Sequence, residues 1–103
     1  MSSEKYINAA QQRALRTLLI LADHDLDGLT PGEIARLLAT LPSNTTRDLA
    51  NLRLAGLAEM LANGRWRITP RVAELAQTLQ QNLDKARRRL EEIQRRYSRD
   101  HKE

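Results

Sequence analysis

A run of helix and turn signals between residues 28 and 70 constrains the fold more than any other feature of the chain. Thr30-Pro31-Gly32-Glu33 forms a capping box, with a threonine N-cap and a proline at the first helical position. Pro42 ends this helix, because the residue before a proline avoids the α region. Ser43 then caps a second helix, which we expect to end at Gly56. The segment therefore predicts two short helices joined by a tight turn.

A two-stranded hairpin is predicted directly after the second helix. The sequence alternates with a period of two on both sides of Asn63-Gly64, which is the strongest short-range signal for a two-residue turn. Pairing Ala62 with Arg65 places Trp66 toward the core. Arg65 and Arg67 then lie on the outer face of the hairpin.

Three segments, GLTPGEIARLL, LANLRLAGLAE and GRWRITPRVAELA, carry a resemblance that extends over roughly residues 14–76. In these segments the chain resembles the winged helix-turn-helix DNA-binding domains of the IclR and MarR regulator families. Such a domain inserts its second helix into the major groove of DNA. One departure from the pattern lies in the connection Ala39-Thr40-Leu41-Pro42, which lacks the glycine that such turns often have.

The resemblance implies that the second helix, which runs to about Ala55, is the recognition helix. Its inward stripe is predicted to be Thr45, Leu49, Leu52 and Gly56, and its outward side Asn44, Arg47, Asp48 and Asn51. Arginine suits guanine and asparagine suits adenine in the major groove. The predicted DNA-binding residues are Ser43, Asn44, Thr46, Arg47 and Asn51 on the helix and Asn63, Arg65 and Arg67 on the wing.

Asp48 is an unusual residue for a face that binds DNA. Three interpretations follow from its predicted position. The carboxylate holds Arg47, or it orients a contact to cytosine, or the face does not bind DNA at all.

The residues from Val72 onward predict one helix of nearly thirty residues, because no glycine or proline interrupts them. Such a helix is about 40 Å long at 1.5 Å per residue. Its apolar residues alternate spacings of three and four, which is a heptad seam typical of self-association. The predicted dimerisation residues are Val72, Ala76, Leu79, Leu83, Ala86, Leu90, Ile93 and Tyr97.

Two units are thus expected: a winged helix-turn-helix DNA-binding domain at 1–70 and a C-terminal dimerisation helix at 71–103. The alternative for the last helix is a lone amphipathic helix folded back on the core. The positions flanking the seam provide no interhelical ion pair, and Asp84–Arg88 is expected to pair within the helix instead. A bundle that also uses the first helix of each subunit, as in MarR-like dimers, fits at least as well as a parallel coil.

The first helix is expected to run from Glu4 to Ala22. Its apolar face is wider than one neighbouring helix needs, so part of it is available to a second subunit, and Arg13 is assigned to its solvent side. The loop after it, Asp23 to Gly28, opens like a calcium-binding EF-hand loop. Position twelve of that loop requires a bidentate glutamate but holds Ile34, so no calcium site is expected.

Composition limits the classes of function. The 103 residues include 41% hydrophobic residues and no cysteine, and the formal net charge is +4. No metal site, cofactor or catalytic motif is recognisable, so an enzyme is not expected. The longest apolar run, Leu18 to Ala22, is far shorter than the roughly 20 residues of a membrane span, and the N-terminus does not resemble a signal peptide. A cytoplasmic protein is therefore expected.

The sequence predicts a mainly α fold with a small β-hairpin, a winged helix-turn-helix followed by a long coiled-coil-like helix. The predicted function is sequence-specific binding to double-stranded DNA by a homodimeric bacterial or phage transcription regulator, with no small-molecule effector implied. The alternative is a winged-helix adaptor or structural subunit that does not read DNA. Leu54 favours that alternative, because it places a leucine on the outer side of the recognition helix.

Overall fold

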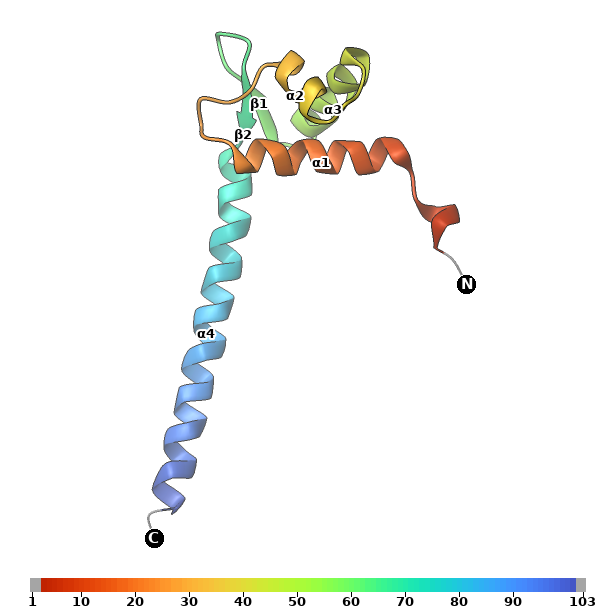
Figure 1. Ribbon diagram of the computed structural model, residues 1–103. Helices are drawn as coiled ribbons and strands as arrows, with labels where there is room; N and C mark the ends of the chain where they lie inside the picture. Colours follow the sequence, from red (N-terminus) through yellow and green to blue (C-terminus); the bar gives the residue numbers. More distant parts are fainter. Residues whose placement is uncertain (1–2, 102–103) are drawn as a thin grey trace. The chain divides into compact units, whose positions relative to one another are not determined.

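The computed structural model describes residues 3–101 of the chain. The elements are the 3-10 helix η1 (Glu4–Tyr6), α1 (Ala9–Asp23), α2 (Pro31–Leu37), α3 (Pro42–Leu54), β1 (Ala58–Met60), β2 (Trp66–Ile68) and α4 (Pro70–His101) (Figure 1). The predicted class, mainly α with a small hairpin and a long C-terminal helix, is confirmed. The chain divides into two compact units, one up to Val72 and one from Ala73 onward.

The first unit is built around a small apolar core. In Figure 1, α1 lies beneath α3 and the hairpin, and it contacts both. Trp66, the only tryptophan of the chain, is buried from the hairpin side. The core residues are Leu21, Leu29, Ile34, Leu49, Leu52, Ala58 and Trp66. Each helix and strand from α1 to β2 therefore contributes at least one side chain to the core.

Helix α1 begins later than the sequence predicted. Asn8 is its N-cap and accepts a hydrogen bond from the backbone N–H of Gln11 at 3.0 Å, so the helix starts at Ala9 rather than Glu4. The face toward the core also differs, because Thr17 and Leu21 are fully buried. Leu15 and Leu19, which belong to the broad apolar face predicted for this helix, are exposed, so the neighbouring elements leave part of that face uncovered.

The predicted capping box of α2 is confirmed. The Thr30 hydroxyl accepts from the N–H of Glu33 at 3.1 Å, and the Glu33 carboxylate accepts from the N–H of Thr30 at 3.0 Å. These hydrogen bonds hold the pKa of Glu33 below its ordinary value, and the charge of Arg65 acts in the same direction. Just before the box, Leu29 forms an antiparallel bridge with Trp66, which ties the start of α2 to the hairpin.

The turn between α2 and α3 differs from the prediction. Helix α2 ends at Leu37, and Ala39 adopts a left-handed conformation with φ = 52°. The N–H of Thr40 reaches the carbonyl of Ala35 at 3.0 Å, and the N–H of Ala39 reaches that of Arg36 at 3.2 Å. This is a Schellman motif with alanine at the position where glycine is usual.

As a result, α3 begins at Pro42, with Leu41 as its N-cap and without a side-chain capping hydrogen bond. The prediction of Ser43 as the N-cap is therefore wrong. Proline at the first helical position fixes the start, because its backbone angle is already helical and its missing N–H needs no partner there.

Helix α3 is terminated by the predicted glycine. Gly56 has φ = 80°, and the N–H of Leu57 bonds to the carbonyl of Leu52 at 2.9 Å. The N–H of Gly56 bonds to the carbonyl of Arg53 at 2.9 Å, which completes a second Schellman motif.

The hairpin has a different register from the predicted one. Met60 lies opposite Trp66, and Glu59 lies opposite Arg67. The loop has three residues, 62–64, because the N–H of Leu61 bonds to the carbonyl of Arg65 at 2.7 Å. Loops of this length commonly place glycine in the left-handed region at their last position, and Gly64 has φ = 86°. The predicted two-residue turn with Ala62 paired to Arg65 is therefore wrong by one residue.

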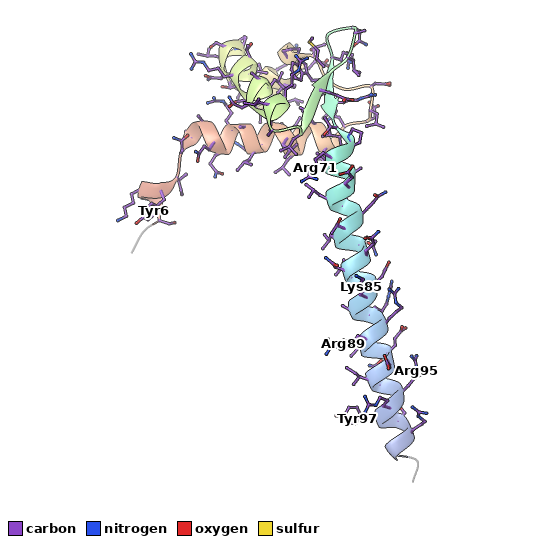
Figure 2. The ribbon with its side chains drawn as sticks, turned by 180° about the vertical axis from the view of Figure 1, so that it is seen from behind. Tyr6, Arg71, Lys85, Arg89, Arg95 and Tyr97 are labelled. Atoms are coloured by element: carbon purple, nitrogen blue, oxygen red, sulfur yellow. The ribbon has the colours of Figure 1, made fainter. Side chains whose placement is uncertain are left out.

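Helix α4 is continuous from Pro70 to His101, and from Ala73 onward it forms the second unit. Figure 2 shows side chains such as Lys85, Arg89 and Tyr97 leaving this helix. Seven of the eight predicted seam residues are exposed, and Val72 is half-buried. Asp84 pairs with Arg87 rather than with the predicted Arg88.

Candidate DNA-binding surface

Helix α3 is held against the core by Thr45, Asp48, Leu49 and Leu52, all of which are buried. These positions follow the spacing of one helical face, so Asp48 lies on the inward side together with the apolar residues. The prediction that Asp48 lies on the outward face is wrong, since only 4% of the residue is exposed.

The partner of Asp48 is Arg13 of α1. Its Nε lies 2.7 Å from Oδ2 of Asp48, and its Nη2 donates to Oδ1 at 3.1 Å, which makes a bidentate pair. The hydrogen bond to Asp48 raises the pKa of Arg13 above its ordinary value. Arg13 is half-buried, so its predicted place on the solvent side of α1 is also wrong.

This pair decides the charge of the outward face of α3. Asp48 is the only acidic residue of the helix, and its carboxylate is neutralised by Arg13 on the inner side. Arg47 and Arg53 are the only basic residues of α3, and both are exposed. The outward face therefore presents positive charge and no carboxylate.

The residues directly opposite the buried stripe are Ser43, Arg47, Ala50 and Leu54, at about 100° of helical rotation per residue. We call them the outer line of α3. Thr46 and Arg53 flank it on one side, and Asn51 flanks it on the other. The exposed face is thus rotated by about a quarter turn from the predicted one. Sequence reasoning missed Ala50 and Arg53, and it assigned Leu54 only to a protein partner.

The polar side chains of α3 are constrained to different degrees. Asn44 is half-buried and donates to the Thr40 hydroxyl at 2.9 Å. The Thr46 hydroxyl donates to the carbonyl of Pro42 at 3.1 Å, and the Asn51 amide donates to the carbonyl of Arg47 at 2.8 Å.

Arg47 is exposed, and no ion pair joins its guanidinium to any residue in the described part of the chain. Arg47 therefore provides a charged group on this helix that is not engaged in an ion pair. Ser43 is also exposed, one turn before Arg47 on the outer line of α3.

Both arginines of the hairpin are engaged within the chain. Arg65 donates to the carbonyls of Asp27 at 3.1 Å and Gly28 at 2.7 Å, and its Nη1 lies 3.4 Å from Oε1 of Glu33. The Asn63 side chain accepts from the N–H of Arg65 at 3.0 Å and so shapes the loop.

Arg67 pairs with the residue opposite it in the hairpin. Its Nε lies 2.8 Å from Oε2 of Glu59, and its Nη1 donates to the carbonyl of Leu26 at 3.4 Å. Arg65 and Arg67 are both half-buried, and together they fix the hairpin to the loop before α2.

A shallow hollow lies beside the outer line of α3. Its lining residues are Thr46, Ala50, Arg53, Leu54 and Trp66. The guanidinium carbon of Arg53 lies 6.0 Å from the centroid of the Trp66 ring, within the range of a cation–π contact. Leu54 is 88% exposed and forms an open apolar wall.

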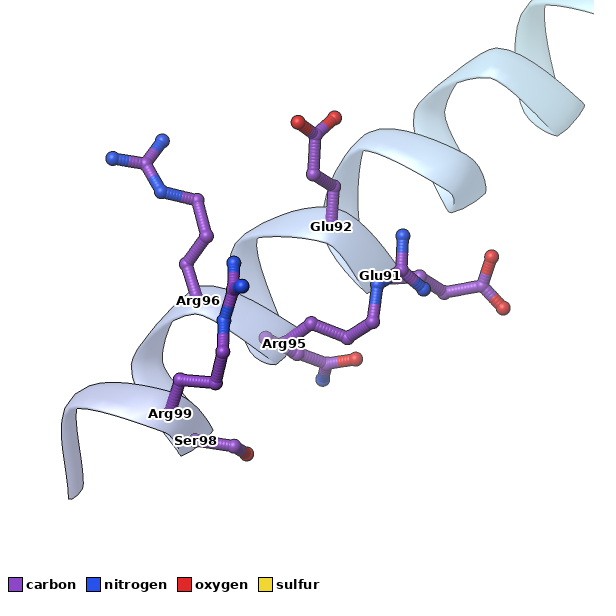
Figure 3. Close-up of a pocket in the computed structure, with 7 residues that line it drawn as sticks. Glu91, Glu92, Arg95, Arg96, Ser98 and Arg99 are labelled. Carbon is purple, nitrogen blue, oxygen red and sulfur yellow. The ribbon is translucent and has the colours of Figure 1, made fainter. Parts of the chain in front are cut away.

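A second recess lies on the last turns of α4 (Figure 3). Its lining consists of Glu91, Glu92, Gln94, Arg95, Arg96, Ser98 and Arg99. All of these residues belong to one helix, with the two glutamates one turn before the arginines. The recess is therefore the charged surface of a single helix and brings no groups together from different elements.

The acidic loop after α1 is closed by its own backbone. The Asp25 carboxylate accepts from the N–H of Asp27 at 3.0 Å, and the N–H of Gly28 bonds to the carbonyl of Asp25 at 3.1 Å. Among the side chains that the structure describes, no three from histidine, cysteine, aspartate or glutamate gather in a way that could hold a metal ion. None of the helices described is long and apolar enough to cross a membrane.

Two short helices on a third, followed by a hairpin bridged to Leu29, define a winged helix-turn-helix. No family model and no curated protein matches the chain. Among solved structures, the chain is similar to a point mutant of MepR from S. aureus, a MarR-family regulator, with a TM-score of 0.54 and 22% sequence identity.

The match covers 84% of this chain and 66% of the MepR chain, so this chain spans about two thirds of that length. The predicted resemblance to the winged-helix fold of MarR regulators is thereby confirmed at the level of the fold.

Proposed function

We propose that the chain is a DNA-binding transcription regulator that places the outer line of α3 in the major groove. Arg47 carries this proposal, because it is an exposed arginine in the middle of a helix whose opposite face is fixed in the core. A bidentate contact from arginine to guanine is the commonest specific contact in the major groove. Ser43, Asn44, Thr46 and Asn51 are proposed to contact neighbouring base edges or phosphates.

The wing is proposed to contact phosphates through Asn63, Arg65 and Arg67. A guanidinium has five N–H donors, so an arginine that already bonds within the chain retains donors for a phosphate. The bonds of Arg65 and Arg67 to the loop before α2 and to Glu59 support a rigid wing.

A homodimer is proposed to form through α4, with Val72, Ala76, Leu79, Leu83, Ala86, Leu90, Ile93 and Tyr97 at its interface. The exposure of nearly the whole seam in the isolated chain supports this assignment. Two copies of α3 would then read two half-sites. The proposed role is DNA binding in the cytoplasm, without catalysis and without a cofactor.

The test is the binding of an Arg47→Ala variant to a duplex selected from a random pool and to random-sequence duplex. Losing a bidentate base contact should weaken binding to the selected duplex by about 1–3 kcal/mol, and binding to random duplex much less. Arg95→Ala removes the same charge from an exposed site of α4 and is the matched control. Equal losses on both duplexes would remove the base-reading role of Arg47.

A protein-binding adaptor is the second candidate function. The exposure of Leu54 and the adjacent hollow favour it, because a large exposed leucine beside an apolar recess is also typical of a protein interface. Salt-dependent retention on heparin or random DNA separates the candidates. A DNA-binding protein is retained and released by salt, whereas an adaptor without affinity for DNA passes through.

A further inference from the structure

We propose that the hollow beside α3 is a subsite for the C5-methyl group of a thymine, with Leu54 and Ala50 as the residues that recognise it. The inference rests on the proposed function and adds a base preference to it. The outer line of α3 changes character halfway along the helix. Ser43 and Arg47 make its first half polar, and Ala50 and Leu54 make its second half apolar.

The chemistry of the major groove restricts what this apolar half meets. Base edges present hydrogen-bond donors and acceptors there, and the thymine methyl is the apolar group among them. Ala50 extends only to Cβ and leaves space above the helix, whereas Leu54 stands beside that space as an exposed wall. A small methyl group therefore fits between them.

The surroundings of the hollow favour DNA over a protein as its occupant. Arg47 lies one turn before Ala50 on the same line, and Arg53 forms the rim of the hollow over Trp66. The only carboxylate of α3 is turned inward to Arg13. A surface with arginines beside an apolar recess and no acid complements a polyanion that carries methyl groups in its groove.

The experiment replaces each thymine of a selected duplex, one at a time, by deoxyuridine, which removes only the C5-methyl group. Burial of one methyl predicts a loss of about three- to fivefold in affinity at one or two thymines of each half-site. Replacement of the other thymines should have no effect. Fluorescence anisotropy titrations give the ratio of the two dissociation constants for each position.

The variant Leu54→Ala assigns that loss to the hollow. It should bind the thymine and deoxyuridine duplexes equally, whatever its affinity for both, and Leu54→Met should keep the preference for thymine. Leu54 is 88% exposed, so neither variant should disturb folding. Leu26→Ala truncates another exposed leucine, outside α3, and should also keep the preference.

Two results would overturn the inference while leaving the proposed function intact. In one, every deoxyuridine duplex binds as tightly as the parent duplex. In the other, the loss persists undiminished in Leu54→Ala. If the random pool yields no enriched duplex at all, the proposed function itself is wrong, and the hollow then belongs to a protein interface.

Discussion

At the scale of single residues, two buried threonines show how differently the core treats the same side chain. Thr17 and Thr45 are both fully buried. The Thr17 hydroxyl donates to the carbonyl of Arg13 at 2.9 Å, whereas the Thr45 hydroxyl has no hydrogen-bond partner in the described part of the chain. A buried polar group without a partner lowers stability, so Thr45 is a weak point of the core.

Replacing Thr45 by valine should therefore stabilise the protein. The change keeps the side-chain shape and removes an unpaired hydroxyl, and we expect a gain of about 1 kcal/mol in the free energy of unfolding. Thr17→Val is the matched control, and it should be neutral or destabilising because it breaks an existing bond. Urea denaturation of both variants measures the difference. Equal effects at the two positions would contradict this account.

The two Schellman motifs provide a second comparison at this scale. Ala39 and Gly56 occupy equivalent positions after α2 and α3, with φ of 52° and 80°. A left-handed conformation costs an L-residue other than glycine about 1–2 kcal/mol. Glycine avoids this cost, but its greater conformational freedom in the unfolded chain offsets part of the advantage.

The variants Ala39→Gly and Gly56→Ala should consequently shift stability in opposite directions. We expect Ala39→Gly to raise, and Gly56→Ala to lower, the free energy of unfolding by about 0.5–1 kcal/mol each. Thermal denaturation followed by circular dichroism is sufficient to see both. A loss of stability in Ala39→Gly would show that the turn is not strained.

At the scale of elements, the orientation of α3 depends on its contact with α1. The Arg13–Asp48 pair joins residues 35 positions apart and lies between the two helices. It keeps the inward face of α3 closed and turns the outer line toward solvent. The exposed pair of Asp84 and Arg87 on α4 lies within one helical turn and has no such role.

The variant Asp48→Ala should lower the melting temperature by about 10 °C, because it leaves a half-buried guanidinium without its partner. Combining it with Arg13→Met should recover part of the loss, since no unpaired charge then remains. Asp84→Ala, which breaks an exposed pair, should have little effect. A small effect of Asp48→Ala would mean that apolar contacts alone orient α3.

The same element shows what the sequence could and could not predict. The capping box at Thr30, the glycine that ends α3 and the continuous α4 depend on neighbouring residues, so local rules were sufficient. The N-cap of α3 was predicted wrongly because Ala39 adopts a left-handed backbone conformation, which is rare for alanine. The hairpin register was missed because Asn63-Gly64 forms part of a three-residue loop.

The outward face of α3 was predicted wrongly for a different reason. A charged residue on an amphipathic helix is normally assigned to solvent, but Asp48 is buried by a partner on another helix. No residue near Asp48 in the sequence indicates that Arg13 is its partner. The spacing of Asp48 relative to Thr45 and Leu52 was the available signal, because it places all three on one face.

At the scale of the whole molecule, the exposed seam of α4 predicts self-association. Replacing Leu90, which is 55% exposed in the isolated chain, by aspartate would place two charges opposite each other in an apolar interface. Light scattering should show a dimer for the parent protein and a monomer for Leu90→Asp. Gln81→Asp introduces the same charge outside the seam and should remain dimeric. An unchanged mass for Leu90→Asp would exclude the seam as the interface.

The central claim, that the chain binds DNA and reads its sequence through the outer line of α3, is tested most directly by titrating the parent protein against a selected duplex over a series of salt concentrations. We predict saturable binding at low salt, at least about tenfold tighter than to random duplex, and a loss of affinity of roughly 0.9 logarithmic units per phosphate contact for each tenfold rise in salt. Unmeasurable binding even at low salt, or equal affinity for both duplexes under all conditions, would contradict this claim.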